Sequence, residues 1–121
     1  MSRLMSVALT EAAVVAKTKT VTRRIGWKFL KPGDRLTLCR KVMGRKQGEP
    51  LVRLAEVEVV DVRREPLSAF QLDDIAREGV PWGFISVREW TWWFMQQTGA
   101  AIDAEVTRIE WRYLDTKGNK E

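Results

Sequence analysis

The chain of 121 residues has the length of one domain, and its 45% hydrophobic residues suffice for a core. The longest stretch without a charged side chain, residues 90–102, is shorter than the roughly 18 apolar residues of a membrane span. The first ten residues lack the apolar block of a secretory signal. These features exclude a membrane partner and predict a cytoplasmic protein.

The sequence has one cysteine, Cys39, and no histidine. One thiol forms no internal disulfide, and it provides too few ligands for a structural zinc site. Catalytic arrangements that depend on imidazole are excluded as well. We therefore expect no metal and no cofactor, and any catalysis must use Lys, Glu, Asp, Thr, Tyr or Arg.

Positive charge is concentrated in the first third of the chain. Residues 1–40 contain nine Lys or Arg and two acidic residues, a net charge of +7, whereas residues 41–121 contain twelve and fourteen, a net charge of −2. A basic region of this kind suits a phosphate-bearing partner such as RNA or a nucleotide, although a merely solvated basic surface is equally compatible with it.

The first half of the chain predicts one short helix and three strands. Residues 10–16 are rich in Ala and begin with Thr10, a good N-cap, so they favour a helix. Residues 18–25 and 35–42 favour strands, separated by a Pro-Gly turn at residues 31–34. Residues 44–50 form a hairpin loop before a long strand at residues 52–64. Its apolar positions change face near Val59, which predicts a β-bulge that bends the strand.

The second half predicts two helices and a last strand. Residues 67–78 favour a helix that Gly79 ends. A capping box at residues 86–89 begins a second helix that runs to about residue 98. Residues 105–114 alternate and predict a strand. The fold class is therefore α+β, a small barrel or rolled sheet decorated by short helices, with one domain at residues 1–114 and a flexible tail at residues 115–121.

Several motifs, in their order, resemble the ASCH domain, which is similar to the PUA domain in its β-barrel fold. They are Lys-Thr-Val-Thr-Arg-Arg at residues 19–24, Lys-Pro-Gly-Asp at residues 31–34, the Val-rich strand, and Glu78-Gly79 at a helix end. The resemblance covers about residues 7–114. One departure is Lys17, which stands where the family usually has Gly two positions before the motif lysine.

The resemblance also implies a possible chemistry, because some small ASCH proteins are amidohydrolases that deacetylate 4-acetylcytidine with Lys, Thr and Glu. The corresponding residues here are Lys19, Thr22 and Glu78, and the motif arginine is Arg24. A lysine nucleophile has to be neutral, so its pKa must lie well below about 10.4. The alternative interpretation is that Lys19 binds a phosphate or simply stays solvated.

The six tryptophans are a second source of candidate binding residues. Helical spacing places Trp90 and Trp93 on the core side of their helix and Trp92 on the opposite side, where it could stack on a base or contact a partner. Trp111 is expected in the core, and Trp27 and Trp82 lie beside glycines in predicted loops. The candidate ligand-binding residues are Lys17, Thr20, Arg23, Arg24, Trp27, Lys28, Trp82 and Trp92.

Together these observations predict an ASCH-type domain that binds RNA, a nucleotide or a modified nucleobase in a basic pocket rimmed by tryptophans. The alternatives are an amidohydrolase that uses Lys19, Thr22 and Glu78, a ribonuclease, and a protein-interaction module that uses exposed tryptophans. The oligomeric state is open, because Trp92 would suit a dimer contact equally well.

Overall fold

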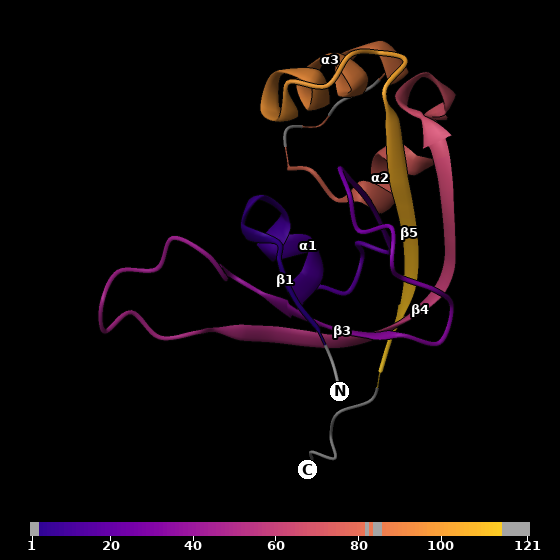
Figure 1. Ribbon diagram of the computed structural model, residues 1–121. Coiled ribbons are helices and arrows are strands. Elements are labelled where there is room, and N and C mark those ends of the chain that lie inside the picture. The colour runs from indigo at the N-terminus through magenta and orange to yellow at the C-terminus, as the bar shows by residue number, and fades with distance from the viewer. Residues whose placement is uncertain (1–2, 82, 84–85, 115–121) are drawn as a thin grey trace.

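The computed structural model describes residues 3–81, 83 and 86–114, and these residues form one curled sheet with short helices (Figure 1). The strands are β1 (Arg3–Ser6), β2 (Val21–Arg24), β3 (Arg35–Cys39), β4 (Arg53–Pro66) and β5 (Glu105–Tyr113), in the sheet order β1-β3-β4-β5-β2. The α-helices are α1 (Glu11–Val15), α2 (Asp74–Glu78) and α3 (Val87–Thr98), and 3-10 turns precede α1 and α2 at Ala8–Thr10 and Leu67–Ala69. The predicted tail at residues 115–121 lies outside the described residues.

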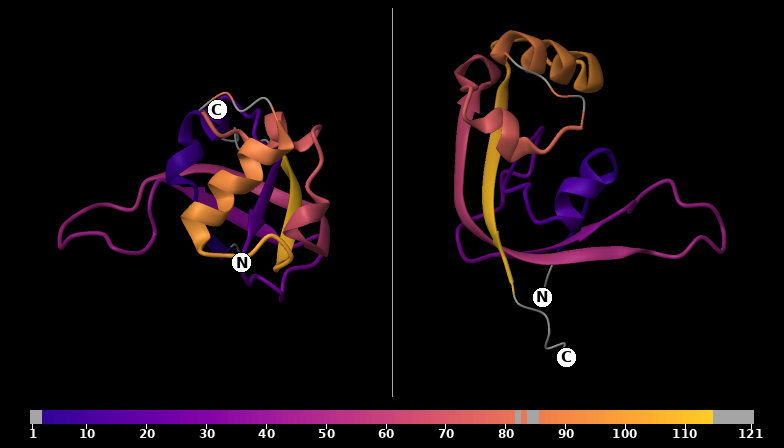
Figure 2. Two further views of the ribbon diagram at one scale, coloured as in Figure 1. Left: turned by 90° about the horizontal axis from the view of Figure 1, so that it is seen from above. Right: turned by 180° about the vertical axis from the view of Figure 1, so that it is seen from behind.

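A bulge in β4 bends the sheet. The pairing of β4 with β5 shifts register between Val59 and Asp61, so Val60 is an additional residue at that point. Figure 2 shows β4 turning sharply near its middle, with α1 and α2 on the concave side. The predicted bulge is confirmed, and the bend that it allows creates the hollow in which the helices lie.

Two buried hydrophobic clusters stabilise the two ends of the bent sheet. The first lies on the concave side around β1, α1, β3 and β4, and includes Met5, Val14, Leu36, Val57 and Trp111. The second joins α3 to the other end of the sheet, and consists of Leu67, Phe70, Trp90, Phe94 and Val106. The predicted burial of Trp90 and Trp111 is confirmed, as is that of Cys39 in β3.

The predicted turn and cap signals in four places are confirmed. The amide of Asp34 donates to the carbonyl of Lys31 across the Pro-Gly turn at 3.1 Å. The Ser86 side chain accepts a hydrogen bond from the amide of Glu89 at the start of α3. Gly79 ends α2, and Gly99 ends α3, each in the left-handed conformation that glycine adopts without strain.

Three predictions about local structure differ from what the structure shows, and one strand was not predicted at all. β1 was not predicted, because its four residues carry no alternating pattern and depend on parallel pairing with β3. The helix predicted at residues 67–78 is interrupted between residues 69 and 74. The strand predicted at residues 18–25 begins only at Val21, after a left-handed residue at Lys17 with φ of 63°. Thr10 does not cap α1, since its hydroxyl donates to the carbonyl of Val7.

Candidate functional site

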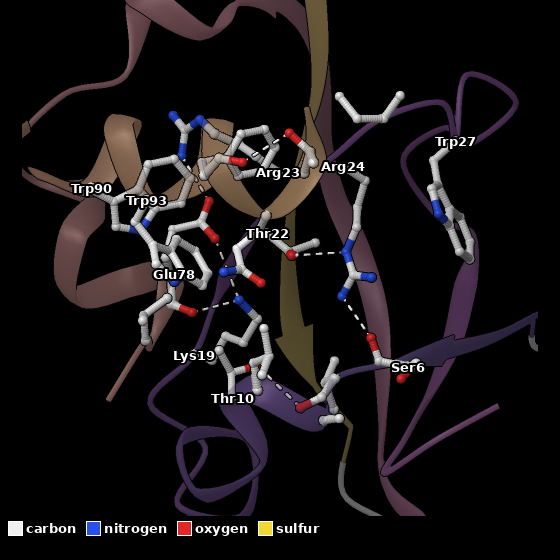
Figure 3. Close-up of a pocket in the computed structure, with 18 residues that line it drawn as sticks. Ser6, Thr10, Lys19, Thr22, Arg23, Arg24, Trp27, Glu78, Trp90 and Trp93 are labelled. Carbon is white, nitrogen blue, oxygen red and sulfur yellow. Dashed lines mark hydrogen bonds and ion pairs between the residues drawn. The ribbon is translucent and has the colours of Figure 1, made fainter. Parts of the chain in front are cut away.

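A pocket of about 590 Å³ lies where the curled sheet does not close on itself. β1 and β2 are the two edges of the sheet, and Arg24 of β2 crosses the opening to donate to the carbonyl of Ser6 in β1 at 2.8 Å. Segments near both edges line the pocket together with one side of α3. The lining residues used below are Lys19, Thr22, Arg23, Arg24, Trp27, Glu78, Trp90, Trp93 and Phe94 (Figure 3).

The buried amine of Lys19 lies at the polar end of the pocket. Lys19 is 2% exposed, and its Nζ lies 3.5 Å from Oε1 of Glu78. The amine also donates to the backbone carbonyls of Val21, at 3.0 Å, and Glu78. The carbonyl of Lys19 accepts hydrogen bonds from Nε1 of Trp111 and from the hydroxyl of Tyr113. Both the backbone and the side chain of Lys19 are therefore fixed in place.

The environment of Lys19 makes its amine easier to deprotonate. Burial lowers its pKa, and the nearby Arg24 and Arg23 lower it further, while the carboxylate of Glu78 opposes them, so that the pKa is about 8. A lysine in water has a pKa of about 10.4. A much larger fraction of Lys19 is thus neutral near pH 7 than of an exposed lysine.

Glu78 reaches Lys19 because α2 packs closely on the segment before β2. Gly79 follows with φ of 74°, and a β-carbon there would lie 2.7 Å from Cβ of Ala13 and 3.0 Å from Cβ of Lys19. The backbone pairing of Thr20 with the carbonyl of Arg77 completes this contact. The Glu-Gly pair of the motif is therefore explained by geometry, since only glycine allows this approach.

Replacing Gly79 by Ala is expected to destabilise the protein by about 1–3 kcal/mol, because a left-handed conformation is unfavourable for alanine and its methyl group would press on Ala13 and Lys19. Gly99→Ala is the matched control, since Gly99 also has a positive φ but no atom within 4 Å of its would-be β-carbon. Urea unfolding of both variants would measure the difference. Equal losses would show that the close packing beside Gly79 contributes nothing.

Arg23 holds the second oxygen of Glu78 in a buried charge cluster. Its guanidinium contacts Oε2 of Glu78 at 3.0 Å, Asp74 at 2.7 Å and Glu65 at 3.1 Å. Asp74 in turn accepts two hydrogen bonds from Arg108. The predicted exposed basic surface therefore does not include Arg23, which is buried and paired with carboxylates. Its arrangement leaves Oε1 of Glu78 beside Lys19.

Thr22 places a hydroxyl group on the pocket wall near this pair. Its Oγ1 accepts a hydrogen bond from Nε of Arg24 at 3.2 Å, which leaves the hydroxyl proton available for another acceptor. Because Arg24 is also bonded to Ser6, it fixes Thr22 and the sheet opening at the same time. Figure 3 shows Thr22, Lys19 and Glu78 grouped together.

Aromatic side chains form the apolar part of the pocket. Trp90 stacks on Phe94, with ring centroids 5.2 Å apart, and meets Trp93 edge to face at 5.9 Å. All three belong to α3 and line the pocket, and Trp27 lines it from the loop after β2. A flat ligand could lie against these rings while its polar edge reaches the polar end.

The structure brings six of the predicted site residues to one pocket: Lys19, Thr22, Arg23, Arg24, Trp27 and Glu78. Four other predicted residues do not line the pocket. Lys17, Lys28 and Trp92 are exposed, and Thr20 is half-buried. Trp82 lies outside the described residues. The catalytic and binding roles of all these residues remain predictions.

Sequence reasoning missed two parts of the site. Trp90 and Trp93 were expected only in the core, yet both line the pocket, together with Phe94. Helical spacing could not separate the two roles, since a residue on the core side of a helix can border a cavity at its edge. The residues of β1 and the turn after it were missed because β1 was not predicted.

Within residues 3–81, 83 and 86–114, no group of three or more Cys, Asp or Glu side chains is placed to hold a metal ion. No helix among them is long and apolar enough to span a membrane.

The sequence matches no protein-family model and no curated protein, but it matches solved structures. An Enterococcus faecalis V583 protein described under the family name DUF984 has a TM-score of 0.65 and 11% identity, covering 100% of this chain and 84% of that one. The ASCH domain from Lactobacillus crispatus JV V101 has a TM-score of 0.62 and 12% identity, covering 93% and 79%. ASCH from Zymomonas mobilis has a TM-score of 0.58 and 13% identity, covering 90% and 65%. The chain therefore has the ASCH-type, PUA-like fold that its motifs predicted.

Proposed function

We propose that this ASCH-type fold binds a nucleoside, or the base of an RNA nucleotide, in the pocket beside Lys19. The observation that carries the proposal is the pairing of a polar end, with Lys19, Thr22 and Glu78, and an aromatic wall that includes Trp93. A nucleobase has the complementary form, with flat apolar faces and a hydrogen-bonding edge. The volume of about 590 Å³ falls in the range of small-molecule sites.

Binding can be tested by titrating the protein with cytidine, 4-acetylcytidine, uridine and adenosine and following calorimetric heats. Trp93→Ala is expected to weaken binding about 5- to 150-fold, which corresponds to the 1–3 kcal/mol of one base stack. Trp92→Ala is the control, because Trp92 is 62% exposed and lies outside the described pocket lining. Equal affinities in wild type and Trp93→Ala would contradict the proposed pocket.

A second candidate function, hydrolysis of the acyl amide of 4-acetylcytidine, is favoured by the buried contact between Lys19 and Glu78. In this reaction the neutral Nζ of Lys19 would form a bond to the acyl carbon, and the carbon–nitrogen bond to the base would break. The departing amine would take a proton from the Lys19–Glu78 pair. Water would then attack the acyl carbon, and its proton would pass through Glu78 to Nζ as the bond between Nζ and the acyl carbon breaks, which releases acetate and restores the amine of Lys19.

The described geometry gives Thr22 a role in the same reaction. Its hydroxyl proton could be donated to the developing oxyanion on the acyl oxygen, since Arg24 uses only the acceptor side of Thr22. Mass spectrometry after rapid quenching would test the covalent step by detecting one acetyl group on the peptide that contains Lys19. An acetyl group found on Thr22 instead would identify the threonine as the nucleophile.

The two remaining alternatives, a ribonuclease and a protein-interaction module, can be tested by other measurements. A ribonuclease would shorten RNA, which gel electrophoresis would detect. A protein-interaction module that uses Trp92 would lose its partner on Trp92→Ala, with little dependence on salt, whereas nucleic-acid binding through phosphate contacts weakens steeply with salt.

A further inference from the structure

Beside the pocket, Trp27 is followed by an exposed aromatic ring that the proposed function does not use. Phe29 is 52% exposed, and its ring centroid lies 5.4 Å from that of Trp27. On the assumption that the proposed function holds, we propose that Phe29 and Arg3 form a second subsite, which binds the nucleotide adjacent to the one whose base occupies the pocket. The substrate class would then be single-stranded RNA rather than a free nucleoside.

The loop after β2 holds Trp27 in a defined place between the pocket and Phe29. Gly26 and Trp27 have φ of 83° and 54°, two successive left-handed residues that turn the chain sharply at the end of β2. The hydroxyl of Thr107 in β5 donates to the carbonyl of Gly26 and fixes this turn. The left-handed conformation is unfavourable for tryptophan, and strain of this kind often accompanies a functional position.

The contact of Arg3 with Phe29 shows that the face of this ring accepts a flat, cationic group. The guanidinium carbon of Arg3 lies 4.3 Å from the centroid of the Phe29 ring, within the range of a cation–π contact. Arg3 is itself exposed and lies on β1, an edge strand of the sheet. A base could therefore stack on Phe29 or on the Arg3 plane, while the guanidinium turns toward the phosphate.

The arrangement and charge of these groups suit a nucleotide beside the pocket. The rings of Trp27 and Phe29 contact each other at 5.4 Å with a tilt of 37°, so they form one continuous aromatic surface that leads out of the pocket. Lys28, between them in sequence, is exposed and adds a second cation to the same loop. This combination of rings and cations favours RNA over a peptide partner.

The experiment compares free cytidine with a single-stranded trinucleotide, CpCpC, by calorimetry at low salt. Wild type is expected to bind the trinucleotide about 5- to 150-fold more tightly, the gain of one additional stack. Phe29→Ala should lose most of that gain and leave the affinity for cytidine unchanged. Arg3→Gln should lower the slope of log affinity against log salt by about 0.7, the value for one phosphate contact on a single strand.

Two matched controls separate this subsite from general effects. Leu72→Ala removes an exposed apolar side chain outside the described pocket lining, and Lys46→Gln removes an exposed cation in the β3–β4 loop. Neither variant should change the affinity gain of CpCpC over cytidine or the slope of log affinity against log salt.

The outcomes distinguish the two proposals. The subsite is overturned if cytidine and CpCpC bind equally, or if Phe29→Ala weakens both ligands alike, as a purely packing role would require. If CpCpC binding depends on Phe29 but cytidine does not bind detectably, the subsite is supported and the pocket as the primary site is overturned. If neither ligand binds, both proposals fail.

Discussion

In the proposed hydrolysis of 4-acetylcytidine, Lys19→Met is expected to lower turnover by at least about 100-fold, because the variant has no amine to attack the acyl carbon. Methionine has a similar length and tolerates burial, and Glu78 keeps its contact with Arg23, so the fold should persist although the lost contact with Lys19 lowers its stability. Cytidine binding is the control and should decrease far less than turnover. Chromatographic assay of released cytidine would measure the rate. A variant that retains the wild-type rate would exclude Lys19 as the nucleophile.

The pH dependence of the same reaction follows from the pKa of Lys19, which burial lowers to about 8. Below that pH the amine is mostly protonated and unreactive, so the rate should rise with pH and level off above about 8. In Glu78→Gln the carboxylate that raises the pKa of Lys19 is lost, and the midpoint should move to lower pH while the maximal rate falls. A rate that declines as pH rises from 6 to 9 would contradict a neutral-amine mechanism.

Asp74→Ala is expected to reduce the free energy of unfolding by about 3–5 kcal/mol, the usual effect of removing one partner from a buried ion pair. The variant would leave Arg23 and Arg108 without the carboxylate that contacts both of them. Asp73→Ala is the matched control, since Asp73 directly precedes Asp74 in the chain and its side chain is exposed. Urea unfolding at pH 7 would compare the two, and equal stability would show that the cluster contributes little.

The stability contributed by Asp74 should also depend on pH. Burial alone would raise the pKa of Asp74, but hydrogen bonds and charges from Arg108 and Arg23 outweigh it and lower the pKa to about 2. Because this folded-state pKa is below the usual value of about 3.9, the stabilisation is complete above pH 4 and is lost as pH falls toward 2. Asp74→Ala should lack this acid-dependent component.

Local signals in the sequence predicted the parts of the fold that depend on local physics. The capping box at Ser86, the glycine after α2 and the parity change near Val59 each correspond to the structure. β1 was beyond such reasoning, because its stability comes from pairing with β3, more than thirty positions away in the chain.

The candidate site also contains features that the sequence predicted and features that it did not. The motif resemblance assigned Lys19 and Glu78 to one site, and the structure places Nζ of Lys19 3.5 Å from Oε1 of Glu78. It did not predict that Arg23 would be buried among three carboxylates, because alternation along a strand shows which face a residue occupies but not what packs against that face. The role of Asp74 carried no signal in the sequence.

The hydrogen bonds to the carbonyl of Lys19 have a consequence for folding kinetics. They come from Trp111 and Tyr113, 92 and 94 positions later in the chain, and β2 pairs along its whole length with β5. Contacts of such high sequence separation form late and slowly, because a long loop has to close first. During synthesis on the ribosome, the pocket can therefore form only after β5 has emerged, and a ligand that binds it would favour the completely folded chain over partly folded intermediates.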